Sequence, residues 1–207
     1  MAVPAHAAEH SCCRARRRGA IEQWLTSHPV AETVHDAQDL PALSPGNTLM
    51  TDTATPEGRL ARLGIELPRV PVPIANFQPF RRHGDMFYLA GQTCEWNGTM
   101  VYSGKLGRDF DVETGQRAAR ICGLNLIAAL RLALGGSLDN VSACIRLGGF
   151  VNADPEFAFV PKVVNGASDL MAEVFGPEIG PHARTAVGVA TLPQNAAVEV
   201  DAIFAVR

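Results

Sequence analysis

The sequence predicts an α+β fold, in which a mixed β-sheet carries two helices packed on one face. From residue 77 onward, segments of strand-like alternation and segments of helical spacing follow in the order strand, strand, short strand, helix, strand, helix, strand, strand. Aliphatic residues occupy both sides of several strands, so the face without helices also needs cover. We therefore expect subunits to associate through that face.

The composition is that of an ordinary globular domain without a strong charge field. The 207 residues are 47% hydrophobic and 19% charged, with a net charge of -3 and a pI near 6.1. No general basic field is present to attract nucleic acid, and no apolar run approaches membrane-spanning length. We expect neither nucleic acid nor a membrane as a partner.

The five cysteines show no metal-ligand spacing. Cys12 and Cys13 are adjacent, whereas Cys94, Cys122 and Cys144 are scattered through periodic segments. This arrangement is typical of reduced thiols in a cytosolic protein. We expect a cytoplasmic location and no metal.

Residues 1–50 differ from the remainder of the chain. They are rich in Ala, His, Arg and Pro and include a basic cluster at 14–18. They lack the apolar core of a signal peptide, and Glu9 and Glu22 argue against a transit peptide. We expect a disordered extension, or sequence upstream of a true start at Met50, followed by a single domain over 51–207.

Capping and turn residues predict the first elements of that domain. Thr55-Pro56-Glu57 has the N-cap, proline and acid of a helix start, and Gly64 ends that helix. Strands are predicted at 77–82 and 86–92, flanking a hairpin turn. Asn97-Gly98 predicts a second hairpin within 93–101, since this pair is typical of a type I′ turn.

Two longer helices and a strand between them follow. Asp111 caps a helix that runs to about Leu134, and a strand is predicted over 141–151, with Ala143, Ile145 and Leu147 on one face. Asp154-Pro155-Glu156 predicts the start of the second helix, which ends near residue 175.

The closing stretch, 181–206, reads as two strands joined by a tight turn at 192–195. Arg184 and Glu199 stand out because these strands are otherwise largely apolar. They need not face each other within one chain. They form a site only if a third element, or another subunit, closes a pocket around them.

Several motifs resemble the Rid family, also called the YjgF/YER057c/UK114 or endoribonuclease L-PSP family. They are Ala90-Gly91-Gln92, Gly149-Phe150-Val151-Asn152 followed by 154–157, and Ala183-Arg184-Thr185-Ala186-Val187 followed by 198–203. The resemblance covers roughly 77–207. Residues 63–65, 164–170 and 182–188 are similar to a longer branch of that family.

This resemblance implies a chorismate-mutase-like fold assembled as a homotrimer, with three clefts between subunits. It implies that Arg184 grips the carboxylate of a 2-imino or 2-aminoacrylate acid, while Gly91 and Glu199 help to position water. Phe77, Thr185 and Asn165 are expected to contribute to substrate binding. The implied activity is that of a 2-iminobutanoate/2-iminopropanoate deaminase-like hydrolase, which releases ammonia and a 2-keto acid without metal or cofactor.

The chemistry also fits the residues independently of the resemblance. A planar guanidinium binds a carboxylate bidentately and so fixes a small acid in one orientation. A polarised imine carbon then requires only a placed water and a carboxylate to orient it.

Other readings stay open at this point. Arg184 also suits a salt bridge across a subunit interface, Glu199 a pairing with a neighbouring arginine, and His182 either proton transfer or a capping role. Phe77 stands where many deaminating members have a tyrosine, and Thr185 where serine is common. The alternative function is therefore a trimeric protein that binds a small carboxylate or carbonyl metabolite without turnover. The acidic pI disfavours RNA cleavage.

Overall fold

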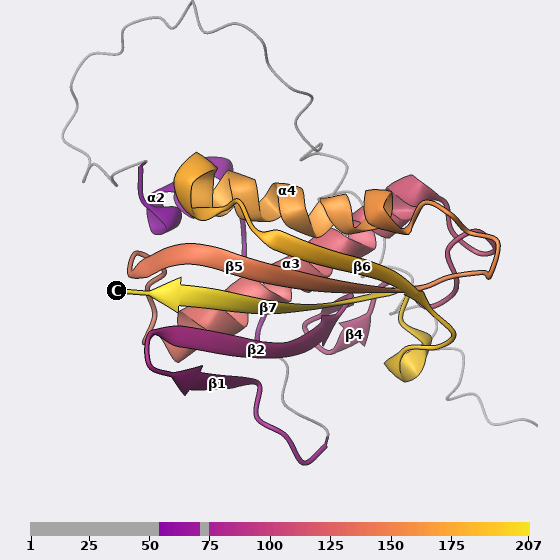
Figure 1. Cartoon of the computed structure of the whole chain (residues 1–207), viewed down its shortest axis with the longest axis horizontal. Helices are drawn as coiled ribbons and strands as arrows, with labels where there is room; N and C mark the ends of the chain where they lie inside the picture. The colour runs from indigo at the N-terminus through magenta and orange to yellow at the C-terminus, as the bar shows by residue number, and fades with distance from the viewer. Residues whose placement is uncertain (1–53, 71–74) are drawn as a thin grey trace, which may run out of the picture. The chain divides into compact units, whose positions relative to one another are not determined.

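A five-stranded mixed sheet is the centre of the computed structural model, which describes residues 54–70 and 75–207 (Figure 1). Its spatial order is β1-β2-β7-β5-β6, and only β5 and β6 run parallel. The strands are β1 (Phe80–His83), β2 (Met86–Thr93), β5 (Val141–Asn152), β6 (Ala183–Val189) and β7 (Val198–Val206). All described residues belong to one compact unit. The prediction for residues 1–50 lies outside the described residues.

Two long helices cover one face of this sheet, as predicted (Figure 1). Helix α3 (Val112–Ala133) packs on β2 and β7, and α4 (Val160–Ile179) packs on β5 and β6. A short helix, α2 (Pro56–Leu63), packs against α4. A 3-10 turn, η1 (Pro193–Asn195), precedes β7. None of the described helices combines the length and the hydropathy needed to cross a membrane.

The predicted caps and the second hairpin are confirmed. The Thr55 hydroxyl accepts from the Gly58 N–H at 3.1 Å, and the Asp111 carboxylate accepts from the Thr114 N–H at 2.8 Å. Asn97 and Gly98 have positive φ angles of 52° and 88°, as a type I′ turn requires. This turn joins β3 (Glu95–Trp96) to β4 (Thr99–Met100) in a separate two-stranded sheet.

Alternation along β7 shows which face of the sheet holds the core. Val198, Val200, Ala202, Phe204 and Val206 are buried toward the helices, and the residues between them are only half-buried. Tyr88 is 45% exposed and Val187 is 40% exposed; both are paired with residues of the other face. We call this second face, which no described helix covers, the open face.

The predicted hairpin of the closing strands is wrong. Strands β6 and β7 do not pair with each other, because β5 lies between them and pairs with both. The 192–195 segment therefore carries the chain across β5 rather than turning it back on itself. A turn signature identifies where a chain reverses, but it does not identify the strand's hydrogen-bonding partner.

The start of the second helix and the faces of β5 are also corrected. Helix α4 begins at Val160, not at Asp154, because the Asp154 side chain accepts from the Glu156 N–H at 3.2 Å in a separate turn. In β5, register shifts between Val141 and Ala143 and between Cys144 and Arg146 break the predicted alternation. Cys144 is buried as a result, and Ile145 is 40% exposed.

The three described cysteines are free and buried, but they differ in thiol chemistry. A hydrogen bond with Cys122 lowers the pKa of Cys94 to about 7, whereas burial raises the pKa of Cys122 well above its usual value. Burial alone raises the pKa of Cys144 to about 12. Cys12 and Cys13 lie outside the described residues.

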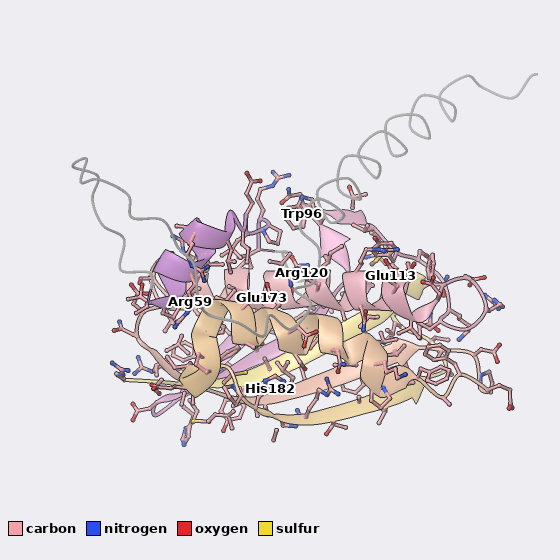
Figure 2. All side chains as sticks on the ribbon, turned by 90° about the horizontal axis from the view of Figure 1, so that it is seen from above. Arg59, Trp96, Glu113, Arg120, Glu173 and His182 are labelled. Carbon is pink, nitrogen blue, oxygen red and sulfur yellow. The ribbon has the colours of Figure 1, made fainter. Side chains whose placement is uncertain are left out.

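Close contact between α3 and α4 depends on Gly166. A Cβ atom at this position would overlap the main-chain carbonyl of Gln116 on α3, and backbone cannot move aside as a side-chain end does. The part-buried Arg120–Glu173 ion pair joins the same two helices through hydrogen bonds of 3.0 and 2.7 Å (Figure 2). The position of α4 over the sheet is therefore tightly constrained.

We predict that Gly166→Ala destabilises the fold by about 1–3 kcal/mol, although alanine is the better helix former. The added methyl group forces α4 away from α3. Urea unfolding measures the change. Gly188→Ala is the control, since the nearest atom to its added Cβ is at an ordinary 3.6 Å. Equal stability of Gly166→Ala and wild type would contradict the tight crossing.

Candidate functional site

Arg184 lies near the start of β6, on the side of the sheet that faces α4. Its partner in the parallel pair is Leu147, a buried residue opposite Ala202 on the helix-covered face. The Arg184 Nη1 donates to Asn165 Oδ1 and to Ser168 Oγ, both at 2.9 Å, and its Nη2 donates to the Pro161 carbonyl at 3.2 Å. Three groups of α4 therefore hold the guanidinium.

The guanidinium keeps part of its donor capacity. Arginine has five N–H donors, and these three hydrogen bonds use three of them. Within residues 54–70 and 75–207, no carboxylate forms an ion pair with Arg184, and the residue is exposed. Two donors thus stay available to an incoming acceptor, the number that a bidentate carboxylate needs.

Asn165 is brought to Arg184, and Ser168 is a contact that the sequence analysis missed. The two residues are three apart on α4, so they lie on the same side of the helix. The three-residue spacing between Asn165 and Ser168 in a predicted helix could have indicated that Ser168 lies beside Asn165. His182 joins this group, because its Nε2 lies 3.0 Å from Ser168 Oγ and its Nδ1 lies 2.7 Å from the Gly180 carbonyl oxygen.

Glu199 and Gly91 form a second group, on the open face. Glu199 lies on β7, where its partners are Thr93 of β2 and Phe150 of β5. A Cβ atom on Gly91 would overlap the Glu199 carboxylate, so the glycine leaves the space that this side chain occupies. Burial raises the pKa of Glu199, and repulsion from Asp201 raises it further.

The two groups are separate within one chain. Arg184 and Glu199 lie on different strands with β5 between them, and their partners Leu147 and Phe150 lie on opposite faces of β5. The expectation that these charges need not face each other agrees with this register. A pocket containing both requires groups from outside a single chain.

Thr185 and Phe77, the other two predicted substrate-binding residues, do not contact Arg184 through any hydrogen bond of the described residues. Thr185 is exposed beside Arg184 but pairs with Gly148, so it belongs to the open face. Phe77 is 46% exposed and precedes β1, which begins at Phe80 rather than at residue 77. Because β1 and β6 are the two edge strands, Phe77 lies at the end of the sheet opposite Arg184.

The group around Arg184 contains a guanidinium and a hydroxyl, which suit a small anion. Among the described residues, no cluster of three or more His, Cys, Asp or Glu side chains is arranged to hold a metal ion. The exposed guanidinium can bind a carboxylate or another planar anion. The Glu199 carboxylate can accept a proton or orient water.

Comparison with known proteins gives a consistent family assignment. Residues 57–206 match the family described as "YjgF/chorismate_mutase-like, putative endoribonuclease". The chain is 44% identical over 144 residues to protein TCP17 of Trypanosoma cruzi, covering 70% of this chain and 89% of that protein.

Two solved structures are also similar. Protein Atu1372 of Agrobacterium tumefaciens, of unknown function, has 45% identity and a TM-score of 0.68, over 73% of this chain and 92% of that one. A protein of Shewanella oneidensis MR-1 described as "a putative endoribonuclease" has 36% identity and a TM-score of 0.70, over 73% of this chain and 99% of that one.

We predict that Glu199→Gln raises thermal stability at about pH 8 and leaves it unchanged at about pH 3.5. The folded-state pKa of Glu199 is raised, so ionisation of the carboxyl costs stability above that pKa. The cost disappears as the pH falls through the window between the raised and the ordinary glutamate pKa. Glutamine does not ionise and so avoids it. Thermal unfolding across this pH range measures the difference.

Glu113→Gln is the matched control. Its carboxylate is exposed and forms an i,i+4 ion pair with Arg117 at 2.8 Å. This variant should show no gain near pH 8. A stability gain for Glu199→Gln that is equal at both ends of the pH range would show that ionisation is not its source.

Proposed function

This chain belongs to the YjgF/chorismate mutase-like family, and we propose that it hydrolyses reactive 2-imino and enamine acids at clefts between the subunits of a homotrimer. The substrates are of the 2-aminoacrylate type, and the products are 2-keto acids and ammonia. The observation that carries the proposal is the anchored Arg184 guanidinium, held by three groups of α4 with two donors left over.

The anchoring supports a carboxylate grip for a physical reason. A free arginine side chain loses several rotatable bonds of freedom when it binds an anion, and this loss weakens binding. Asn165, Ser168 and the Pro161 carbonyl restrict that freedom beforehand. The remaining donors then bind a carboxylate at a lower entropic cost and set the orientation of the rest of the substrate.

Glu199 supports the hydrolytic step. Water adds to the imine carbon, a proton moves to the nitrogen, and loss of ammonia leaves the carbonyl of the keto acid. A carboxylate whose pKa is raised by burial and by Asp201 is a stronger base than an ordinary glutamate. We assign it the role of orienting this water and accepting its proton. Gly91 leaves the space that the carboxylate occupies.

The homotrimer is part of the proposal because one chain leaves both the open face and the site incomplete. Tyr88, Ile145 and Val187 are 40–45% exposed, and large apolar side chains exposed on one sheet face are typical of an interaction surface. Arg184 lies at one edge of the sheet and Phe77 at the other. Association of identical subunits offers a way to bring the edge of one chain to the face or edge of the next.

Ligand binding without turnover is the second candidate. Phe77 favours it, since the ring has no hydroxyl to take part in proton transfer. The Arg184 grip would serve binding equally well. RNA cleavage is not proposed, because the net charge is -3 and the candidate site presents one exposed arginine rather than a basic stripe.

We predict that wild-type protein accelerates keto-acid release from freshly generated 2-aminoacrylate, and that Arg184→Ala lowers kcat/KM about 100-fold. Hydrogen bonds to a charged group contribute about 1.5–3 kcal/mol each, which is roughly a factor of ten or more for each bond lost. A coupled assay for the keto acid measures the rate. Arg108→Ala is the control, since Arg108 lies on an exposed loop paired with Asp109.

The assay separates the two candidates. Turnover no faster than the spontaneous reaction, together with Arg184-dependent thermal stabilisation by small carboxylic acids, would establish the binding protein instead. Equal turnover by wild type and Arg184→Ala would remove Arg184 from the reaction.

We predict that Val187→Glu, on the open face, dissociates the trimer. A carboxylate in an apolar subunit interface is costly unless it is paired. Sedimentation velocity should give about three times the monomer mass for wild type and a smaller mass for the variant. Glu156→Gln, in an exposed turn after β5, is the control. A monomeric wild-type protein would contradict the assembly.

A further inference from the structure

Ser168 differs from the other two groups that hold Arg184. The Asn165 side-chain oxygen and the Pro161 carbonyl oxygen can only accept hydrogen bonds. The Ser168 hydroxyl both donates and accepts, and it rotates to suit its surroundings. Whether it presents a lone pair to Arg184 therefore depends on where its own hydrogen points.

His182 determines that direction. Its Nδ1 lies 2.7 Å from the Gly180 carbonyl oxygen, and because a carbonyl only accepts, Nδ1 must carry the hydrogen. In the neutral ring, Nε2 is then an acceptor, 3.0 Å from Ser168 Oγ. Ser168 donates to this nitrogen and accepts from Arg184 at 2.9 Å. The hydrogen bonds thus run in one direction, from Arg184 through Ser168 and His182 to Gly180.

We propose that His182 is a positioning residue for Arg184, acting through Ser168 to hold the guanidinium with its unpaired donors free for a carboxylate. The inference rests on the proposed function, because it assigns a role within the same carboxylate grip. His182 itself touches neither the bound acid nor the reacting carbon.

The fold explains why this histidine is available. Helix α4 ends at Ile179, and β6 begins at Ala183, so the connection between them is short. Gly180 lies in this connection and supplies the carbonyl for Nδ1, two residues before His182. In Figure 2, His182 lies on the side of α4 away from Arg120 and Glu173, which join that helix to α3. The histidine is half-buried, as a positioning group should be.

Two substitutions of His182 separate its two nitrogens. His182→Asn retains a donor near the position of Nδ1 but has no atom at the position of Nε2. His182→Gln reaches the position of Nε2 and offers an acceptor to Ser168. If the proposal is right, the glutamine preserves the function of the histidine and the asparagine does not. Ser168→Ala should behave like His182→Asn, and Ser168→Thr, which retains the hydroxyl, like wild type.

The first measurement does not depend on any activity. Nitrogen-15 NMR of full-length protein should show the His182 ring protonated at Nδ1 and bare at Nε2. The Arg184 guanidinium signals should show slow rotation about the Cζ–Nη1 bond in wild type, His182→Gln and Ser168→Thr. They should show fast rotation in His182→Asn and Ser168→Ala. A His182 ring protonated at Nε2 alone would overturn the proposal, and so would Arg184 signals that are unchanged in both His182→Asn and Ser168→Ala.

The second measurement is the dissociation constant of pyruvate, used as a small 2-keto acid probe, with KM and kcat for 2-aminoacrylate. We expect His182→Asn and Ser168→Ala to raise the dissociation constant and KM about tenfold, with kcat changed less than about twofold. His182→Gln and Ser168→Thr should stay within about threefold of wild type. Ser137→Ala is the matched control, since its hydroxyl lies in the loop after α3.

These outcomes distinguish the positioning role from the proposed function. Absent turnover with the expected order of pyruvate affinities would refute the deaminase and support the positioning role. Turnover with equal KM values in all variants would support the deaminase and overturn the positioning role. If His182→Asn does not fold, Ser168→Ala tests the same link, and if wild type binds no pyruvate, the Arg184 NMR signals decide.

Discussion

The parallel pairing of β5 with β6 is the constraint on which the candidate site depends. Parallel strands cannot be joined by a tight turn, so the chain must cross over the sheet between them, and α4 is that crossover. The crossover places α4 against the helix-side residues of β6, which include Arg184. It also leaves β6 at the edge of the sheet and sets β5 between Arg184 and Glu199.

The position of the Arg184 guanidinium depends on how tightly α4, which holds it, is packed against the rest of the fold. Gly149 of β5 leaves space for the Val164 side chain, and Gly166 leaves space for the Gln116 carbonyl, so the helix lies close to both the sheet and α3. Gly166 follows Asn165 in the sequence, and Gly149 accommodates Val164, the residue that precedes Asn165. Larger residues here would displace the helix turn that carries Asn165 and Ser168. Packing in the core therefore sets the geometry of a surface arginine.

Sequence patterns predicted the types of the elements well and their partners poorly. The caps at Thr55 and Asp111 were readable because capping is local chemistry. The hairpin prediction for 181–206 failed because strand pairing is decided by long-range register.

The same limit applies to the site. Arg184 and Glu199 stand out in the sequence as charges in apolar strands, but the sheet faces on which they lie follow from their pairing with β5, whose bulges no local pattern revealed. The sequence left His182 as either a proton-transfer group or a surface or capping histidine, and its contacts to Ser168 and to the Gly180 carbonyl depend on neighbours that no local pattern identifies.

The separation of the two groups is itself an argument for assembly. Ionisation of the half-buried Glu199 carboxyl, whose pKa is raised, costs stability in the isolated chain, and the exposed Arg184 guanidinium keeps two donors beyond those that α4 uses. Their positions coincide with the features that a lone subunit leaves unsatisfied, namely the open face, which carries Glu199, and the edge strand β6, which carries Arg184. Covering that face and edge with identical subunits would bury the exposed apolar residues. The same contacts would give each Arg184 neighbours that its own chain does not supply.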